Sequence, residues 1–256
     1  MPKEKIRLDE MVLRLGLESD PKIVRSLILS GSVLVNETPV TKVGTLVHSS
    51  DKIRIRDKIK TYVSRGAYKL LGAFQFFNTL DVGDKTCIDL GSSTGGFTQV
   101  LLEKHAKQVF AVDVGYGLLA QKIANHPNVI VLDRKHVKDL KWEDLKTEDN
   151  EIFISMDLSF ISLLAVFSHL QNLFESPGHK ISFSGISLIK PQFELHPSKL
   201  EKGVVKSKKD IYHCLISVWR NLRKIDPKLK RLGLKESPIQ GTTGNREFLL
   251  YWKRDC

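Results

Sequence analysis

The first sixty residues alternate between helical and strand-like hydrophobic patterns. Apolar residues recur at helical spacing over residues 8–15, and Gly16 ends this pattern. Asp20 and Pro21 suit the N-cap and the first position of a second helix. Short apolar runs typical of strands follow at residues 33–35, 40–47 and 53–56. We therefore expect a small α+β domain over residues 1–60, with the polar residues 57–61 as its linker.

From residue 65 onward, strand and helix patterns alternate. The strands are expected at residues 86–90, 108–113, 128–132, 152–157 and 186–190, and helical patterns lie between most of them, at 96–105, 116–124 and 161–174. This alternation predicts a parallel, doubly wound α/β sheet of Rossmann-like type over residues 61–256. Two final strands, near 231–236 and 246–252, flank the glycine-rich turn at 241–245 and predict a hairpin at the end of the sheet. Such an ending is typical of methyltransferase folds rather than of dinucleotide dehydrogenases.

The charge of the chain is positive and unevenly distributed. Lys and Arg number 40 against 29 Asp and Glu, a formal net charge of +11. Residues 196–235 carry twelve basic and three acidic side chains. A concentrated surplus of this kind favours a polyanionic partner, with nucleic acid first and an anionic membrane surface second.

Cysteines and histidines give no sign of a disulfide framework or a metal site. The three cysteines are far apart, and no CxxC pair or HExxH segment occurs. The N-terminus has no continuous apolar segment, and no apolar stretch approaches membrane-spanning length. We expect a cytoplasmic protein without a metal and without stable membrane association.

The segment DLGSSTGGF at Asp89–Phe97 joins a predicted strand to a predicted helix through a glycine-rich loop. Glycine lets the backbone approach a ligand closely, and a helix N-terminus offers free N–H groups. Such a loop binds either a dinucleotide or S-adenosylmethionine. The next predicted strand ends in Asp113, 22 residues after Gly91, the separation expected for a carboxylate that binds ribose hydroxyls. Asp113 could instead be a helix N-cap, and Asp133 either lies near the adenine or is an exposed loop residue.

Longer sequence blocks occur along almost the whole chain. They are RLD at 7–9, GSVLVN at 31–36, YVSRGAYKL at 62–70, DLGSSTGGFT at 89–98, VDVGYG at 112–117, MDLSFIS at 156–162, KPQFE at 190–194, KGVV at 202–205 and SPIQGTTGNREFLL at 237–250. In content and order they resemble the TlyA family, the hemolysin-named ribosomal RNA 2′-O-methyltransferases. Members of that family have an N-terminal S4 domain and an FtsJ-like catalytic domain.

The resemblance implies an S4 fold over residues 7–56 that places the enzyme on ribosomal RNA or a ribosomal subunit. The implied RNA contacts are Arg7, Lys22, Arg25 and Arg65. One departure is that Asp20–Pro21 stands where S4 domains often carry Ser-Arg, which puts one RNA contact in doubt. The resemblance also implies S-adenosyl-L-methionine as the methyl donor, held by Asp89, Gly91, Ser92, Ser93, Gly95, Gly96, Phe97, Asp113 and Asp133.

FtsJ-like enzymes use a Lys–Asp–Lys–Glu set, and the matching residues here are Lys69, Asp157, Lys190 and Glu247. Lys190 would orient or deprotonate the 2′-hydroxyl of a cytidine ribose in 16S or 23S ribosomal RNA. Lys69 would favour a neutral Lys190, whereas the two carboxylates act in the opposite direction, so both a base and a cation stay open. Separately, Lys69 and Glu247 could form a surface ion pair. Phe160 and Phe193 would line the cofactor site, stack on the target base, or belong to the core.

Three other functions compete with this interpretation. A catalytically silent RNA-binding module would have lost the tetrad or the glycine-rich loop, and both are present. A membrane-active hemolysin should carry a spanning hairpin or a strongly amphipathic basic helix, and only residues 207–225 come near this description. The same residues also fit a helix that covers the sheet and turns its charged side to RNA. A nicotinamide dehydrogenase leaves the tetrad and the S4-like segment without a purpose.

Overall fold

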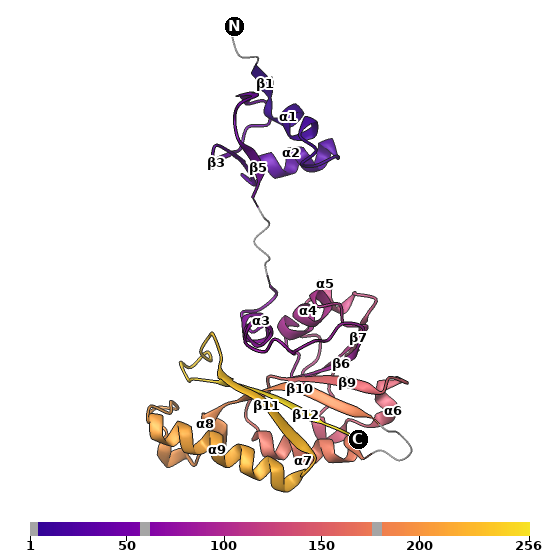
Figure 1. Ribbon diagram of the computed structural model, residues 1–256, viewed down its shortest axis with the longest axis vertical. Helices are drawn as coiled ribbons and strands as arrows, with labels where there is room; N and C mark the ends of the chain where they lie inside the picture. The colour runs from indigo at the N-terminus through magenta and orange to yellow at the C-terminus, as the bar shows by residue number, and fades with distance from the viewer. Residues whose placement is uncertain (1–4, 57–61, 176–180) are drawn as a thin grey trace. The chain divides into compact units, whose positions relative to one another are not determined.

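The computed structural model describes residues 5–56, 62–175 and 181–256, so the expected linker at 57–61 lies outside the described residues. The chain divides into two compact units, Met1–Thr61 and Tyr62–Cys256 (Figure 1). Each unit encloses its own cluster of buried apolar side chains.

The first unit packs two helices on short antiparallel strands. Helix α1 (Leu8–Arg14) is followed by α2 (Pro21–Leu29), and the Asp20 side chain caps α2 by accepting the Lys22 N–H at 2.7 Å. The strands are β1 (Lys5–Arg7), β2 (Val33–Val35), β3 (Thr38–Val40), β4 (Leu46–His48) and β5 (Ile53–Ile55). They form a sheet of order β3-β2-β5 and a separate β1-β4 pair.

The strand expected over residues 40–47 is wrong as a single element. Strand β3 ends at Val40, and β4 begins at Leu46 and pairs with β1 instead of joining the three-stranded sheet. A turn separates the two strands, because both the N–H and the hydroxyl of Thr45 donate to the carbonyl of Lys42. The hydrophobic pattern runs through this turn, so it could not reveal the break.

The second unit contains a seven-stranded sheet of order β11-β12-β10-β9-β6-β7-β8. Five strands are parallel: β6 (Thr86–Leu90), β7 (Gln108–Val112), β8 (Val129–Leu132), β9 (Glu151–Met156) and β10 (Ser182–Ile189). Strand β12 (Phe248–Arg254) runs antiparallel to both β10 and β11 (Leu229–Glu236). The predicted parallel sheet with a terminal hairpin is confirmed.

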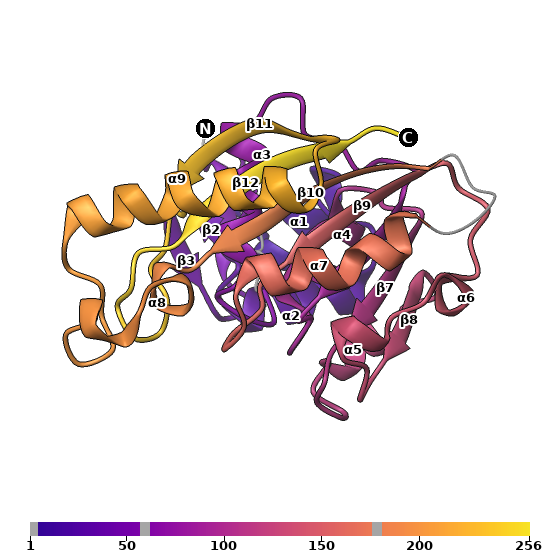
Figure 2. The same ribbon diagram turned by 90° about the horizontal axis from the view of Figure 1, so that it is seen from below.

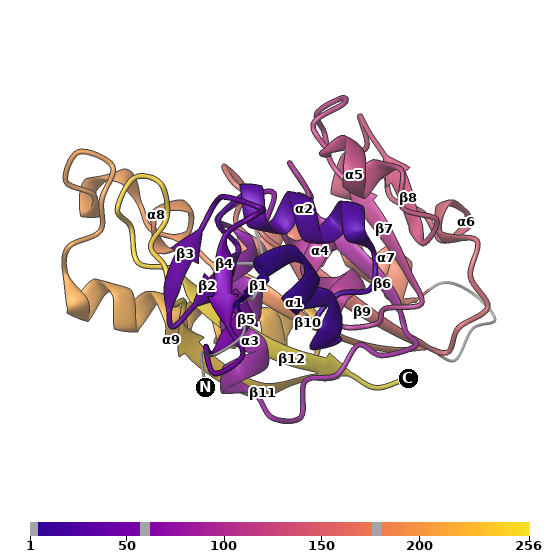
Figure 3. The same ribbon diagram turned by 90° about the horizontal axis from the view of Figure 1, so that it is seen from above.

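Helices cover both faces of this sheet. Helices α7 (Leu163–Phe174) and α9 (Lys208–Ile225) lie on one face (Figure 2). Helices α3 (Ala67–Phe76), α4 (Gly96–Glu103) and α5 (Gln121–Ala124) lie on the other (Figure 3). Successive strand residues face opposite layers: Leu250 and Trp252 of β12 belong to the core under α7 and α9, whereas Leu249 and Tyr251 belong to the core under α3 and α4.

Three helical segments differ from expectation. The helix predicted over 116–124 is confined to the four residues of α5, because Gly115 and Gly117, the latter at φ +64°, belong to a preceding loop. Helix α4 ends at Glu103 rather than 105. Helix α3, which carries Lys69, has no counterpart among the expected helices. The short helices α6 (Trp142–Leu145) and α8 (Pro191–Glu194) complete the unit.

Candidate active site

The glycine-rich loop follows β6 and touches the segment that follows β9. Gly91 has φ +80°, and a Cβ added there would lie 3.0 Å from the carbonyl oxygen of Asp157 and 3.0 Å from the Leu158 side chain. Glycine is therefore required for this close approach. The contact places the loop at the carboxyl ends of the parallel strands, where open α/β sheets bind their ligands.

A cavity of about 570 Å³ opens beside this loop, which we call the donor cavity. Its wall is mostly apolar, with contributions from Val112, Leu118, Val137 and Ile161, and it includes the carboxylate of Asp113. The two oxygens of Asp113 accept the N–H groups of Ser93 and Gly115 at 2.9 and 2.8 Å. Asp113 is not the N-cap of a helix, since α5 begins only at Gln121.

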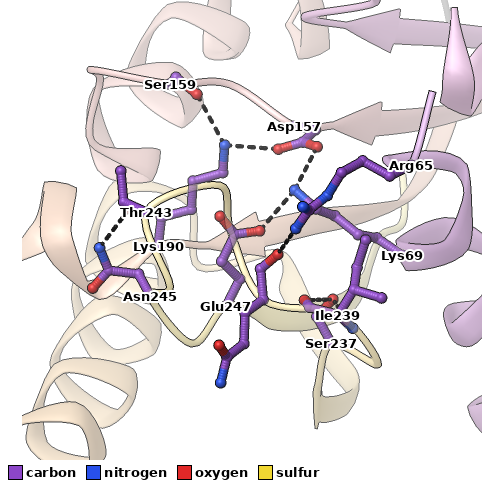
Figure 4. Close-up of polar contacts among 11 residues, drawn as sticks. Arg65, Lys69, Asp157, Ser159, Lys190, Ser237, Ile239, Thr243, Asn245 and Glu247 are labelled. Atoms are coloured by element: carbon purple, nitrogen blue, oxygen red, sulfur yellow. Dashed lines mark hydrogen bonds and ion pairs between the residues drawn. The ribbon is translucent and has the colours of Figure 1, made fainter. Parts of the chain in front are cut away.

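Four charged side chains meet at the wall of a second cavity of about 550 Å³, the acceptor cavity (Figure 4). Asp157 lies between two lysines: its Oδ1 is 2.7 Å from Lys190 Nζ and its Oδ2 is 2.9 Å from Lys69 Nζ. Glu247 Oε2 is 2.7 Å from Lys69 Nζ. Lys69, Lys190 and Glu247 are 8%, 6% and 3% exposed, so this is a buried network and not a surface ion pair.

Four different elements bring these side chains together. Asp157 follows β9 directly, and Lys190 follows β10, its neighbour in the sheet. Glu247 immediately precedes β12, which pairs with β10 on the other side. Lys69 comes from the first turn of α3. The parallel strands therefore fix two members, and the antiparallel hairpin and one helix supply the others.

In this network, burial and the opposite charges act in opposite directions on the pKa values of its members. Burial alone would raise the pKa of Asp157, but the charges of Lys190 and Lys69 outweigh it and lower that pKa. Burial would lower the pKa of Lys69, but Asp157 and Glu247 outweigh it and raise that pKa. Asp157 is therefore a carboxylate and Lys69 an ammonium at neutral pH.

The two cavities share a wall, built from Gly91, Ser93, Asp157, Ser159 and Phe160. Phe160 is 91% exposed, has φ +64° and lies with its ring 5.3 Å from that of Phe193. An exposed aromatic ring on a left-handed backbone is uncommon. The interpretation of Phe160 as a core residue is therefore wrong.

Several expected cofactor residues line a cavity, and three do not. Gly91 and Ser93 line both cavities, and Ser92, Gly96 and Phe97 line the acceptor cavity. Asp89 is fully buried outside both and accepts the hydroxyls of Thr98 and Ser155 at 2.7 and 2.8 Å. Gly95 packs against the segment before α5 and against α5 itself, because an added Cβ would lie 2.8 Å from Leu119 and 3.2 Å from Ile123. Asp133 accepts the Gly117 N–H and holds the loop beyond the donor cavity.

The four expected RNA contacts have different surroundings. Arg7 makes two hydrogen bonds to Asp9, at 3.0 and 2.8 Å, which offset its charge. Lys22 and Arg25 are exposed on α2 and form no ion pair within the described residues. Arg65 lines the acceptor cavity and donates to the carbonyl of Gln240 at 2.6 Å.

Two residues at the site were missed by the sequence interpretation. The hydroxyl of Ser159 accepts a hydrogen bond from Lys190 Nζ at 3.1 Å. Asn245 joins two loops of the acceptor cavity: its amide donates to Gly203 and accepts from the N–H of Val205. Ser159 lies two residues after Asp157 in the MDLSFIS block, so its position could have signalled a role, whereas nothing in the sequence pairs Asn245 with Gly203.

Comparison with known proteins identifies the family of the chain and agrees with a methyltransferase fold. Residues 62–254 match the FtsJ-like methyltransferase family, and residues 6–53 match the S4 domain. The chain is 34% identical to the 16S/23S rRNA (cytidine-2′-O)-methyltransferase TlyA of Mycobacterium tuberculosis, over 96% of this chain and 88% of the relative. It is 36% identical to hemolysin A of Brachyspira hyodysenteriae, over 96% of this chain and 99% of the relative. A solved hemolysin structure from Streptococcus thermophilus aligns with a TM-score of 0.69 at 31% identity. The alignment covers 98% of this chain and 89% of that structure.

The chain therefore belongs to the TlyA family of FtsJ-like methyltransferases with an N-terminal S4 domain. It is a methyltransferase, and this family and fold imply S-adenosylmethionine as its methyl donor. "Hemolysin" is the name that some relatives carry. Among the described residues, no helix has the length and apolar character needed to cross a membrane.

Proposed function

We propose that this protein transfers a methyl group from S-adenosylmethionine to the 2′-hydroxyl of a cytidine ribose in ribosomal RNA. One observation carries the proposal: the buried chain Glu247–Lys69–Asp157–Lys190 borders the acceptor cavity, and Asp157 also borders the donor cavity. The name of the Mycobacterium tuberculosis relative supports cytidine ribose in 16S and 23S ribosomal RNA as the substrate.

The donor cavity has the chemistry that S-adenosylmethionine requires. Its apolar wall suits the purine, and Asp113 has lone pairs left for ribose hydroxyls after accepting two backbone N–H groups. Because Gly91 has no Cβ, the glycine-rich loop can pack directly against Asp157 and Leu158 at the wall that the two cavities share. Bound S-adenosylmethionine supplies a methyl group on a positively charged sulfur.

The acceptor hydroxyl needs a group that orients it and takes its proton. Lys190 Nζ forms an ion pair with Asp157 Oδ1 at 2.7 Å and donates a hydrogen bond to Ser159 Oγ, and we assign a further position on the nitrogen to the ribose hydroxyl. In its neutral form this nitrogen accepts the hydroxyl proton, and Asp157 stabilises the ammonium that results. Lys69 stays charged and prevents the two carboxylates from repelling each other.

The exposed ring of Phe160 and the half-buried ring of Phe193 suit an unstacked base. Phe160 and Phe193 lie at the acceptor cavity, and single-stranded bases stack on aromatic side chains of this kind. The S4 unit supplies positively charged side chains that contact phosphates and position the enzyme without reading sequence. Lys22 and Arg25 are the contacts we propose there.

The test is transfer of labelled methyl groups from S-adenosylmethionine to purified small and large ribosomal subunits, followed by mapping of the product. We expect Lys190→Ala to lower kcat at least ~100-fold, as loss of a general base does, with cofactor Kd unchanged. Lys190→Arg keeps a cation but cannot accept a proton, so it should be equally inactive. The matched control is Lys107→Ala, which removes a surface lysine paired with Asp149.

Activity of Lys190→Arg near the wild-type level would show that Lys190 acts as a cation and would reject the base. Unchanged transfer by Lys190→Ala or Asp157→Ala would reject the whole network. Product found on a base nitrogen instead of the ribose would reject 2′-O-methylation.

A further inference from the structure

Helix α9 has one face packed on the sheet and one face open to solvent (Figure 2). The packed residues are Ile211, Cys214, Val218 and Leu222. On the opposite face, exposed residues recur at intervals of three or four, which aligns them along the helix. These residues, which we call the α9 stripe, are Lys209, Tyr212, Ile216, Arg220 and Lys224.

Within the described ranges, the cations of the stripe have no carboxylate partners. Lys209, Arg220 and Lys224 form no ion pair within the described part of the chain. Other surface lysines of this unit do: Lys107 pairs with Asp149, and Lys230 with Asp255. The stripe is therefore a local surplus of positive charge, and not a face on which charges of both signs balance.

Helix stability does not account for this arrangement. Arg220 and Lys224 are four residues apart, where like charges destabilise a helix by ~0.2–0.5 kcal/mol. Lys209 is the second residue of α9, where the helix dipole favours acidic side chains. Between these cations Tyr212 is 64% exposed, so an aromatic ring stands among them. Cations interleaved with an exposed aromatic ring suit a nucleic-acid backbone with accessible bases.

The stripe is close to the acceptor cavity along the chain. Gly203 lines that cavity, and α9 begins five residues later at Lys208, a span of at most ~18 Å. Asn245 fixes the connecting segment by bonding Gly203 and Val205. An RNA strand that leaves the cavity past Gly203 therefore meets the N-terminal end of the stripe first.

We propose that the α9 stripe is a second RNA-binding surface, which contacts phosphates of the same RNA whose ribose enters the acceptor cavity. This inference rests on the proposed function. A membrane surface is the other polyanion to consider, but the apolar face of α9 is already buried in the core. Tyr212 and Ile216 are the only exposed apolar residues of the stripe, which is too little apolar surface to enter a bilayer. RNA needs only the charged face.

The test uses the full-length protein and purified ribosomal subunits, with binding measured by filter retention from 50 to 300 mM salt. The stripe variant is Lys209→Gln/Arg220→Gln/Lys224→Gln. The control variant is Lys85→Gln/Lys104→Gln/Lys107→Gln, which removes three charges near the amino ends of β6 and β7, away from the cavities. Both variants lower the net charge of +11 by three. Cofactor affinity, measured by calorimetry, reports that each variant is folded.

We expect the stripe variant to bind at least ~10-fold more weakly at physiological salt and to lose ~2–3 from the slope of log K against log salt. The control variant should stay within ~2-fold of wild type. Equal affinity of the stripe variant and wild type would overturn the inference, and so would equal losses in both variants, which would indicate net charge alone.

Phosphatidylglycerol vesicles provide the membrane comparison. Vesicle binding that depends on the stripe, with unchanged ribosomal-subunit binding, would overturn RNA as the partner. Failure of the wild-type protein to methylate either subunit would reject the proposed function, whereas the binding measurement would still decide the role of the stripe.

Discussion

Ser159 shows how much depends on one hydroxyl group beside the network. It accepts a hydrogen bond from Lys190 Nζ at 3.1 Å and lies in the wall that both cavities share. Removing it leaves Lys190 anchored by Asp157 alone, so the nitrogen can swing away from the acceptor hydroxyl. Ser159 is therefore a positioning residue that acts through Lys190.

We expect Ser159→Ala to lower kcat ~10-fold, the equivalent of ~1.4 kcal/mol, which is near the top of the ~0.5–1.5 kcal/mol range for a single hydrogen bond. KM for ribosomal subunits and Kd for the cofactor should change by less than ~3-fold, because the hydroxyl orients the lysine and binds neither ligand. Ser159→Thr restores the hydroxyl and should recover most of kcat. An Ala variant with normal kcat, or a Thr variant as slow as Ala, would contradict this role.

Asp89 is a buried carboxyl group whose role is structural. Burial raises its pKa to about 6, although hydrogen bonds from Thr98 and Ser155 act against this. A folded-state pKa above the unfolded value means that the folded state holds the proton more tightly. This contribution to stability is complete below pH 3.8 and is lost as the pH rises to about 6.

Asp89→Asn removes this dependence. The free energy of unfolding of wild type, relative to the variant, should fall by about 2 kcal/mol between pH 4 and pH 7, because pH 4 already lies slightly above the unfolded-state pKa of 3.8. Urea unfolding at both pH values measures it, with Asp139→Asn on the surface as the control. If wild type and Asp89→Asn differ in their free energy of unfolding by the same amount at both pH values, the pKa of Asp89 is not raised in the folded state.

At this scale, chain order and sequence blocks located the four network residues but not their contacts. Asp157 and Lys190 end neighbouring strands, so an open parallel sheet brings them together. Asp89 and Gly95 also belong to the glycine-rich segment, yet neither lines the donor or the acceptor cavity. The Asp89 side chain is buried in the interior, and the Cα of Gly95 packs against Leu119 and helix α5. The orientation of a residue within a loop depends on tertiary packing, which a local motif does not encode.

At the scale of elements, the acceptor cavity depends on two loops that Asn245 holds together. Its side chain is 1% exposed and bonds Gly203, Val205 and Thr243, so it links the segment before α9 to the β11–β12 turn. Glu247, two residues later, belongs to the network. Buried amide groups left without partners are costly, so this link is specific.

Asn245→Ala should lower the free energy of unfolding by ~1–3 kcal/mol, because Gly203 and Val205 lose their partner. KM for ribosomal subunits should rise more than kcat falls, since the loops form the wall and not the reacting groups. The control is Asn125→Ala, which removes an exposed amide bonded to Gln121. Unchanged stability and KM would show that the loops hold their position without Asn245.

Strand order and helix layers followed from periodicity, but the loop-rich elements did not. Every predicted strand of the large sheet exists, because apolar runs bounded by polar residues mark buried strands clearly. The segment 116–124 fails because its apolar residues, such as Leu119, serve a small core between loop and sheet instead of a helix. The spacing of apolar residues indicates which positions are buried. In segment 116–124 a loop buries Leu119, so the apolar pattern did not require a helix there.

At the scale of the whole molecule, the two units divide the work of binding and chemistry. We expect Lys22→Glu/Arg25→Glu in the S4 unit to weaken binding to ribosomal subunits ~10-fold and to reduce its salt dependence. Cofactor Kd should not change, because the donor cavity is built entirely from the second unit. Calorimetry with S-adenosylmethionine measures cofactor binding, and filter binding with ribosomal subunits measures RNA binding. A loss of cofactor affinity in the S4 variant would refute the assignment of cofactor binding to the second unit alone.

The shared wall has a thermodynamic consequence for the affinities of the two ligands. Asp157, Ser159 and Phe160 each border both cavities, so an occupant of either cavity acts on the same short segment. Any factor by which the methyl donor strengthens RNA binding must equal the factor by which RNA strengthens binding of the donor. Where that factor depends on the methyl group, transfer of the group changes the coupling felt by the spent cofactor and by the RNA product by the same factor.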